Sequence, residues 1–425
     1  MNEVSPKPSR IDRRAVRAPA DTPFARDDAR SHGARDTGNL VLHADNRVAL
    51  PWLRAAFTGA FRCVYLDPPY NTGRAFAHYD DRTSPEAWSR TITEQLEAIR
   101  PLVADDGAVF AEIDDTELGS LLVALDRVFG REQRVATITV VRSAPTGHKA
   151  KNRGPVNVTD YVIVVAKDRT RFRPATLERE RRGYDFAYGT WLDGSLDDPG
   201  TWTFSPLRAT FAARSGHASV RDAKRASGDE AFERGTVAFA MENADRVVRF
   251  AQPRFDAVSH DARALILASK ADPSRVLVLE RARHSPFFLH RGNRVLFLAD
   301  KVRRTPSGPK LVEPITNVWD DVPFQGIARE GGVAYVRNKK PERLIDRILR
   351  MATRPGDWVL DPFAGSGTTA AVAHKMGRRW VAVESSDAVD SLLLPRLRSV
   401  VDGTDATGVT RDHGFTGGGG FDVLA

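Results

Sequence analysis

Four consecutive residues, Asp67-Pro68-Pro69-Tyr70, place a carboxylate, two rigid rings and an aromatic side chain directly after an apolar run. A carboxylate and a neighbouring backbone carbonyl can accept both N–H bonds of an amine, which draws the nitrogen toward tetrahedral geometry and frees its lone pair. The fixed φ angles of the prolines would hold the carbonyl of Pro68 in place. The ring of Tyr70 could stack on a planar group. These residues therefore suit chemistry on an amine conjugated to an aromatic ring.

A second short run lies far downstream, where Asp361-Pro362-Phe363-Ala364-Gly365-Ser366-Gly367-Thr368 follows another apolar segment. Its two glycines allow a tight turn and a close approach of the backbone to a ligand, as in other nucleotide-binding loops. No lysine follows the last glycine, so the run is not a phosphate-binding P-loop. The pattern indicates a ligand site where a strand turns into a helix.

Three further polar positions flank these runs. Glu384 follows an expected strand at 380–383, where an acid can accept hydrogen bonds from both hydroxyls of a ribose. Lys340 precedes Pro341, which suits the first turn of a helix. Asp45 belongs to a turn after the first expected strand.

Together these residues resemble the catalytic and cofactor-binding loops of amino-methyltransferases that act on DNA bases. The order, with the catalytic loop first, is that of the circularly permuted, or β, class. The extended string at 67–73, Asp-Pro-Pro-Tyr-Asn-Thr-Gly, is similar to type III restriction-modification methylation subunits and related adenine-specific methyltransferases. The similarity covers about 39–170 and 313–390. It implies S-adenosyl-L-methionine as the cofactor and double-stranded DNA as the substrate.

The resemblance also implies roles for individual residues. Catalysis would be carried by Asp67, Pro68, Pro69 and Tyr70, with Tyr70 stacking on a base turned out of the duplex. Phe363 would pack on the adenine or the methionine portion of the cofactor. In the family's Gly-Asp-Asn turn the glycine is replaced here by Ala44. The expected cofactor-binding residues are Asp45, Asp67, Lys340, Asp361, Phe363, Ala364, Gly365, Ser366, Gly367, Thr368 and Glu384.

An aspartate at the first catalytic position goes with adenine in this family, whereas serine is commoner in enzymes that methylate the cytosine amine. We therefore expect transfer to the exocyclic N6 amine of adenine, with N4-cytosine methylation as the alternative. Methylation of RNA or of a protein amide is disfavoured because those enzymes usually carry the glycine loop first. A non-catalytic DNA-binding subunit is disfavoured by the intact Asp67, Tyr70, Gly365 and Glu384.

The elements that must position these loops alternate between strand-like and helix-like runs. Expected strands lie at 39–43, 63–66, 108–113, 135–141, 161–166, 358–360 and 380–383, and expected helices at 48–57, 85–100, 117–129, 341–352 and 368–376. This alternation predicts an α/β fold with a doubly wound, mostly parallel sheet, as in a Rossmann-like methyltransferase.

The alternation weakens in the centre of the chain, where prolines, glycines and charges mix around short strand-like pieces at 236–240 and 275–279. We interpret the centre as an inserted, mixed α+β target-recognition module. The predicted organisation is a disordered tail at 1–38, a catalytic half at 39–171, the module at 172–312, a cofactor-binding half at 313–402 and a flexible tail at 403–425.

The charge distribution favours a nucleic-acid partner. The 425-residue chain carries a net charge of +8, and Lys and Arg clearly outnumber Asp and Glu in 142–182. We expect DNA contacts from Asn71, Arg142, Lys149, Lys151 and Arg153.

The remaining composition bounds the setting. One cysteine excludes an intramolecular disulfide and fits a cytoplasmic location, and no apolar run is long enough to span a membrane. The ten histidines lack metal-ligand spacing, so no metal site is expected. Many relatives form homodimers, and some serve restriction or defence systems as subunits. The sequence leaves both open for this chain.

Overall fold

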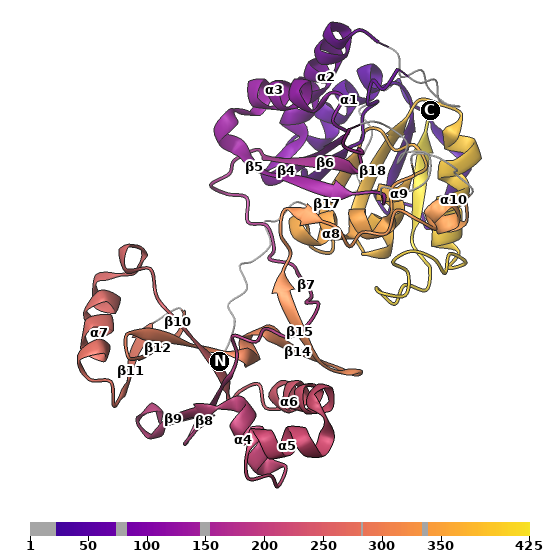
Figure 1. The fold of residues 1–425 in the computed structure, drawn as a ribbon. Helices are drawn as coiled ribbons and strands as arrows, with labels where there is room; N and C mark the ends of the chain where they lie inside the picture. The colour runs from indigo at the N-terminus through magenta and orange to yellow at the C-terminus, as the bar shows by residue number, and fades with distance from the viewer. Residues whose placement is uncertain (1–22, 74–82, 145–153, 282–283, 334–338) are drawn as a thin grey trace. The chain divides into compact units, whose positions relative to one another are not determined.

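The computed structural model describes residues 23–73, 83–144, 154–281, 284–333 and 339–425 (Figure 1). The chain forms two compact units. Unit 1 comprises Met1–Leu177 and Ile315–Ala425, and unit 2 comprises Glu178–Pro314. The predicted module boundaries, 172 and 312, lie a few residues before those of unit 2.

Unit 1 is built on a ten-stranded sheet. In spatial order its strands are β1 (Arg26–Gly33), β19 (Gly420–Leu424), β2 (Leu40–His43), β18 (Arg379–Glu384), β17 (Trp358–Asp361), β3 (Phe61–Leu66), β4 (Val103–Ile113), β6 (Thr159–Ala166), β5 (Arg134–Val141) and β16 (Val318–Trp319). The pairs β1–β19, β4–β6 and β5–β6 are antiparallel, and the other neighbours run parallel.

Helices cover both faces of this sheet. One face packs against α1 (Asn46–Phe57), α2 (Pro85–Ile99) and α3 (Leu118–Phe129), and the other against α8 (Glu342–Ala352), α9 (Thr368–Lys375) and α10 (Leu394–Val401). Strand β3 serves both cores because its side chains alternate: Cys63 and Tyr65 enter one core, Val64 and Leu66 the other. The predicted doubly wound, mostly parallel fold is confirmed.

Local signals start and stop the helices beside the catalytic loop. Helix α2 begins at Pro85 because the hydroxyl of Ser84 accepts a hydrogen bond from the N–H of Ala87. Helix α1 begins after Asp45, whose carboxylate accepts from the N–H of Arg47. Helix α3 ends at Gly130, which takes a positive φ of 101°.

The two predicted tails need correction. The predicted flexible tail at 403–425 contains β19, which lies between β1 and β2 and buries Phe421, Val423 and Leu424. The alternating apolar pattern of this strand follows a glycine run that makes a turn and not an open linker. The predicted disordered segment at 1–38 contains β1, whereas residues 1–22 lie outside the described part of the chain.

The described residues of unit 2 form two antiparallel sheets and four α-helices. The six-stranded sheet has the order β11 (Val276–Arg281), β12 (His284–His290), β13 (Asn293–Phe297), β10 (Val247–Ala251), β8 (Thr190–Asp193), β9 (Thr203–Pro206). The three-stranded sheet has the order β14 (Val302–Thr305), β15 (Gly308–Pro314), β7 (Glu178–Glu180). The helices are α4 (Leu207–Arg214), α5 (Val220–Ser227), α6 (Asp229–Glu242) and α7 (His260–Ala271).

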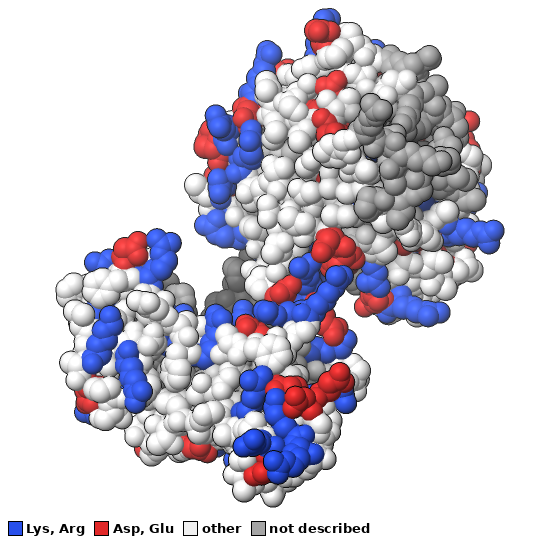
Figure 2. All heavy atoms as spheres, viewed as in Figure 1, with Lys and Arg blue, Asp and Glu red and all other residues white. Residues whose placement is uncertain are grey.

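The mixed α and β content of unit 2 matches the prediction, with one local error. Residues 236–240, expected as a strand, lie within α6, where Phe232, Thr236 and Ala240 are buried at four-residue spacing. On the face drawn in Figure 2, Lys and Arg side chains are spread among Asp and Glu and do not form a single patch. Among the described residues no helix combines the length and apolarity needed to cross a bilayer.

The chain enters and leaves unit 2 at one place. Strands β7 and β15 pair antiparallel, with Glu178 opposite Pro314 and Glu180 opposite Val312. Just outside them, the N–H of Ile315 donates to the carbonyl of Leu177 at 2.9 Å. Unit 2 is therefore an insertion whose two ends are adjacent.

Candidate active site

Four neighbouring parallel strands bring the predicted loops to one edge of the sheet. In the order β2, β18, β17, β3, their carboxyl ends lead into the turn at 44–46, Glu384, the loop at 361–367 and the loop at 67–70. Parallel strands expose their carboxyl ends at a common edge, which is where open α/β sheets bind ligands. Segments nearly 300 residues apart in the sequence therefore meet at one site.

The catalytic loop is fixed by α2 and α3. The indole N–H of Trp88 in α2 donates to the carbonyl of Pro69 at 2.7 Å. Asn71 takes a positive φ of 56°, and its amide group donates to Glu117 Oε1 at 2.8 Å and accepts from the N–H of Thr83 at 3.0 Å. Asn71, predicted to contact DNA, thus uses its side chain within the protein to hold the loop.

Lys340 lies at the centre of the site. Its ammonium is 3.0 Å from Asp67 Oδ1 and 2.9 Å from Glu112 Oε1, and it donates to the hydroxyl of Tyr70. The other oxygen of Glu112 accepts a hydrogen bond from the hydroxyl of Tyr65. Glu112 is fully buried in β4, and the Lys340 side chain is 11% exposed. A single cation therefore joins the catalytic loop to a buried carboxylate.

The surroundings of the site raise the pKa of several aspartate carboxyls toward 7. Burial raises the pKa of the Asp67 carboxyl to about 6; the Lys340 ammonium opposes this rise and Glu112 adds to it. Burial likewise raises the pKa of Asp361, and of Asp160 in β6, to about 7. Burial alone would lower the pKa of Lys340, but the carboxylates around it outweigh that effect and raise it. Lys340 therefore stays charged across the physiological range.

The glycine-rich loop has the conformation that its sequence demands. Gly365 and Gly367 take positive φ angles of 49° and 73°, and Gly367 opens α9. The N–H of Phe363 donates to Asp361 Oδ1 at 3.0 Å, and the N–H of Ala364 donates to the carbonyl of Val383 at 3.0 Å. These bonds fix the loop to β17 and β18, and leave a glycine backbone open to close approach.

Glu384 is held by backbone donors. One carboxylate oxygen accepts from the N–H of Gly365 at 2.8 Å, and the other from Ser385 and Ser386 at 3.0 and 2.9 Å. Three of the roughly four lone-pair sites of the carboxylate are thus occupied. Accepting from both hydroxyls of a ribose would therefore require one of these three N–H groups to be released.

The turn at 44–46 contributes a residue that the sequence reading did not single out. The amide of Asn46 donates to the carbonyl of Pro362 at 2.7 Å, and its own buried oxygen has no hydrogen-bond partner among the described residues. A buried unpaired acceptor is costly unless a ligand satisfies it. Asp45, a predicted cofactor residue, instead caps α1 and pairs with Arg47 at 3.0 Å, which lowers the pKa of its carboxyl.

The predicted DNA contacts are only partly placed by the structure. Arg142 is half-buried and pairs with the buried carboxylate of Asp160 at 3.2 Å. Lys149, Lys151 and Arg153 lie outside the described residues. Near Asn71 the surface forms an open hollow of about 740 Å³, lined by Asn71, Gly73, Thr83, Ser84, Pro85, Thr116, Glu117 and Ser120.

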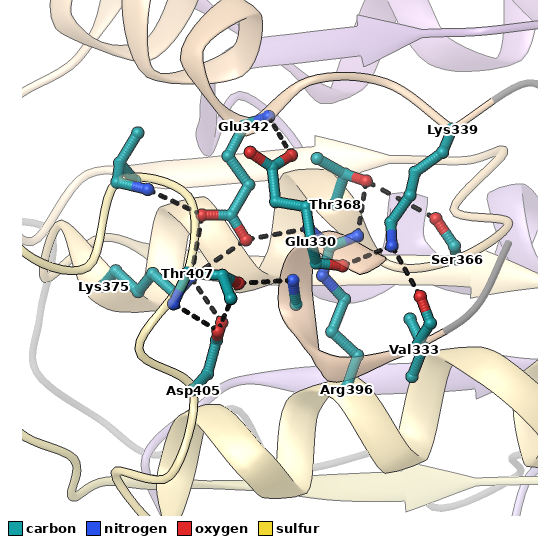
Figure 3. Close-up of polar contacts among 12 residues, drawn as sticks. Glu330, Val333, Lys339, Glu342, Ser366, Thr368, Lys375, Arg396, Asp405 and Thr407 are labelled. Carbon is teal, nitrogen blue, oxygen red and sulfur yellow. Dashed lines mark hydrogen bonds and ion pairs between the residues drawn. The ribbon is translucent and has the colours of Figure 1, made fainter. Parts of the chain in front are cut away.

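A buried charged cluster supports the first turn of α9 (Figure 3). The carboxylate of Glu342 accepts from Lys375 Nζ at 2.7 and 2.9 Å and from Arg396 Nη2 at 2.8 Å. Lys375 also pairs with Asp405 at 2.6 Å, and Arg396 donates to the hydroxyl of Thr368 at 2.7 Å. The four charged side chains are at most 1% exposed. The cluster thus ties the glycine-rich loop to α8, to α10 and to the segment before β19.

Glu112, Asp160 and Asn46 belong to the site, although the sequence reading gave them no role. Glu112 is the single charged residue in the apolar run 108–113, and Asp160 precedes the apolar run 161–166. An isolated acid in a buried strand requires a partner, and this signal could have identified both residues.

Comparison with known proteins identifies relatives of this chain. The family described as DNA methylase matches residues 61–234 and 254–391. The "Probable type III restriction-modification enzyme HindVI Mod subunit" of Haemophilus influenzae is 26% identical over 404 residues, which is 90% of this chain and 53% of that protein. The type II methyltransferase M.EcaI of Enterobacter cloacae is 25% identical over 393 residues, 89% of this chain and 74% of its own length.

Among solved structures, the M1.HpyAVI–SAM complex aligns with 84% of this chain and 98% of its own, at 14% identity and a TM-score of 0.37. The chain spans about half the length of the HindVI Mod subunit.

Proposed function

The chain belongs to the DNA methylase family, and on that premise we propose that it transfers a methyl group from S-adenosyl-L-methionine to the N6 amine of adenine in DNA. The observation that carries the proposal is the adjacency of two loops. Asp67 follows β3, and the glycine-rich loop follows β17, the parallel neighbour of β3. This adjacency would place a methyl donor and an amine acceptor side by side.

The residues at the glycine-rich loop suit the proposed cofactor. Gly365 and Gly367 have no side chain to block a ligand, Glu384 is held at the next strand end, and the oxygen of Asn46 is buried with no partner in the described part of the chain. We assign adenosine binding to this edge, with Phe363 packing on the cofactor. When bound, S-adenosyl-L-methionine supplies a methyl group on a positively charged sulfur, which is displaced in line.

The catalytic loop would prepare the amine. In our proposal Asp67 and the carbonyl of Pro68 accept the two N–H bonds of the amine, so that its lone pair can attack the methyl carbon. Tyr70 stacks on the flipped base and offsets part of the few kcal/mol lost on unstacking it. The methylated nitrogen then carries a positive charge and releases one proton. A carboxylate whose pKa is about 6 can accept that proton at neutral pH and pass it to water.

Adenine is proposed over cytosine on two grounds. Asp67 occupies the first position of the catalytic motif, and several named relatives are type III restriction-modification Mod subunits. The family covers both N6-adenine and N4-cytosine enzymes, so the base must be identified by experiment.

We propose that unit 2 reads the DNA sequence and that this methylation serves a restriction-modification system. Unit 2 is a separately folded insertion, which leaves the site in unit 1 intact while the recognised sequence varies. Several relatives, among them the HindVI Mod subunit named above, are type III restriction-modification enzyme subunits, which supports this setting.

The test uses purified protein, labelled S-adenosyl-L-methionine and unmethylated plasmid DNA, followed by mass spectrometry of the nucleosides. We expect N6-methyladenine with the wild type and none with Asp67→Asn, which should bind the cofactor within a few-fold of wild type. The control Asp105→Asn, an exposed residue paired with Lys167 and Arg171, should retain full activity. Methylcytosine would overturn the base, and no methylated nucleoside would overturn the proposed reaction.

A further inference from the structure

A series of contacts leads from a buried carboxylate in the core to the catalytic carboxylate, Asp67. Glu112 is fully buried, and its two oxygens bind Tyr65 on one side and Lys340 on the other. Lys340 in turn contacts Asp67 and Tyr70, the two residues expected to touch the target base. The most buried group thus lies farthest from the substrate, and the substrate-facing groups are the last in the chain of contacts.

Glu112 fixes the position of Lys340. A lysine side chain has four rotatable bonds, and holding it in one rotamer costs conformational entropy. The carboxylate of Glu112 offsets this cost because a buried ammonium needs a charged partner at hydrogen-bond distance. The strand β4, which carries Glu112, runs parallel to β3 with Ala111 opposite Leu66, next to Asp67. The anchor is therefore attached to a rigid neighbour of the catalytic loop.

We propose that Glu112 and Lys340 form a positioning pair: Glu112 holds the ammonium of Lys340, and that ammonium holds Asp67 ionised and oriented toward the target amine. Glu112 has no contact with the expected substrate and acts through Lys340. The inference rests on the proposed function, and it adds a role for Lys340 different from the cofactor contact expected from the sequence.

The pair acts on Asp67 with opposite signs. The positive charge of Lys340 favours the ionised carboxylate, whereas the negative charge of Glu112 disfavours it. The charged and titratable groups around Asp67 come from several elements: Tyr65 of β3, Tyr70 of the catalytic loop, Glu112 of β4, Asp361 of β17, Lys340 before α8, and Asp160 of β6 with its partner Arg142. Only Lys340 among these is a cation in direct contact with Asp67.

Two single variants should therefore move the pH profile of methyl transfer in opposite directions. Lys340→Met should shift the acid limb of the single-turnover rate upward by about one pH unit or more, because Asp67 loses the charge that keeps it ionised. Glu112→Gln keeps an oxygen that can accept from Lys340 and removes only the negative charge, so it should shift the same limb downward. Glu112→Leu removes the anchor itself and should lower the rate at its pH optimum far more than Glu112→Gln does. Affinity for S-adenosyl-L-methionine, measured by calorimetry, should change little in Glu112→Gln. If the two residues had only a structural role, Lys340→Met and Glu112→Gln would both lower the rate at every pH and leave the acid limb at the same pH.

A measurement that needs no activity tests the same pair. Lys340→Met leaves Glu112 buried without a cation and should lower the melting temperature, whereas the double variant Lys340→Met/Glu112→Gln should recover part of the loss. Asp105→Asn, on the exposed part of β4, is the matched control and should change neither readout.

The outcomes separate the pair from the proposed reaction. An acid limb that stays fixed in Lys340→Met, or equal rates for Glu112→Gln and Glu112→Leu, would overturn the positioning role, as would melting-temperature losses that simply add in the double variant. If the wild type fails to methylate DNA, the proposed function fails, and the melting temperatures still decide whether the two residues act as a pair.

Discussion

Asp361 and Asp67 end neighbouring parallel strands, and each carboxyl has lost most of its contact with water. For Asp361 burial raises the pKa most, and the hydrogen bonds from the Thr369 side chain and from the N–H of Phe363 compensate only partly. A carboxyl in these surroundings holds its proton to higher pH than the same group in an unfolded chain. Part of the pH dependence of the protein's stability therefore comes from single residues of the site.

This difference predicts how stability changes with pH. The pKa of Asp361 is about 7 in the folded protein against 3.8 for an ordinary aspartate, so between these values the folded state binds a proton that the unfolded chain does not. The stability that this group contributes is complete below about pH 4 and is lost as pH rises through 7, by at most about 4 kcal/mol. Asp361→Asn should flatten the decline in melting temperature between about pH 4 and pH 7. An unchanged decline in the variant would contradict the assignment.

The sequence predicts which residues belong to the candidate site better than it predicts the contacts between their side chains. Asp67, Tyr70 and the glycine-rich loop are recognisable because the motif residues are contiguous. The contact between Lys340 and Glu112 joins positions far apart in the chain, and no local pattern predicts it. Asn71 is recognisable as part of the motif and was expected to contact DNA, but its side chain donates a hydrogen bond to Glu117 within unit 1.

Individual elements carry the geometry that the cofactor loop needs. Helix α9 begins directly from the left-handed Gly367, and a Cβ at that residue would lie 3.1 Å from the Leu393 side chain. Its first turn is also held by Arg396, which donates to Thr368. Backbone conformation and a buried charge therefore act on the same few residues.

Gly367→Ala tests the backbone contribution. The positive φ should cost about 1–2 kcal/mol, and the contact with Leu393 should displace the loop and weaken S-adenosyl-L-methionine binding. Gly377→Ala is a matched control, because Gly377 has a similar φ of 70° and no atom within 4 Å of an added Cβ. Both variants should lose similar stability, and only the first should lose affinity in calorimetry. Equal affinities would show that the loop tolerates the side chain.

Lys375→Met tests the buried cluster. Removing one cation leaves Glu342 and Asp405 partly uncompensated in a fully buried site, which should destabilise the protein by about 3–5 kcal/mol. Lys310→Met removes an exposed pair with Glu180 and should cost less than about 1 kcal/mol. Chemical denaturation of both variants measures the difference. Comparable losses would mean that the cluster is no more stabilising than a surface ion pair.

Elements were predicted well where apolar periodicity was strong and less well where it was short. The strands of the parallel sheet and helices α2 and α3 follow the expected pattern closely. The strand predicted at 236–240 was wrong because a five-residue, mainly apolar run fits either a strand or about one and a half turns of a helix. Strand β19 was missed because a run of glycines precedes it, and glycines mark tight turns as readily as linkers.

At the scale of the whole molecule, the residues of the candidate active site lie in unit 1, outside the inserted unit 2. Unit 1 contains both ends of the candidate site, and unit 2 is joined to it through the adjacent residues Leu177 and Ile315. Because these residues already meet in an antiparallel arrangement, a short connection can replace the insertion without straining the sheet.

Joining residue 177 to residue 315 through a short glycine linker tests this separation. We expect the shortened protein to fold cooperatively and to bind S-adenosyl-L-methionine with an affinity close to that of the full chain. Sequence-selective methylation of DNA should be lost, because unit 2 is the proposed reader. Calorimetry and methylation of a defined set of duplexes measure the two properties. Loss of cofactor binding would show that the site depends on unit 2.

The strand order β1, β19, β2 also has a consequence for synthesis. A ribosome releases β1 and β2 early, yet the strand that belongs between them emerges only after residue 420 has been added. Until then β1 has no neighbour in the sheet, and the edge of β2 displays unpaired backbone groups that can associate with other chains. This part of the sheet can therefore close only after residues 420–424 have been synthesised, and the unpaired edge of β2 stays exposed until then.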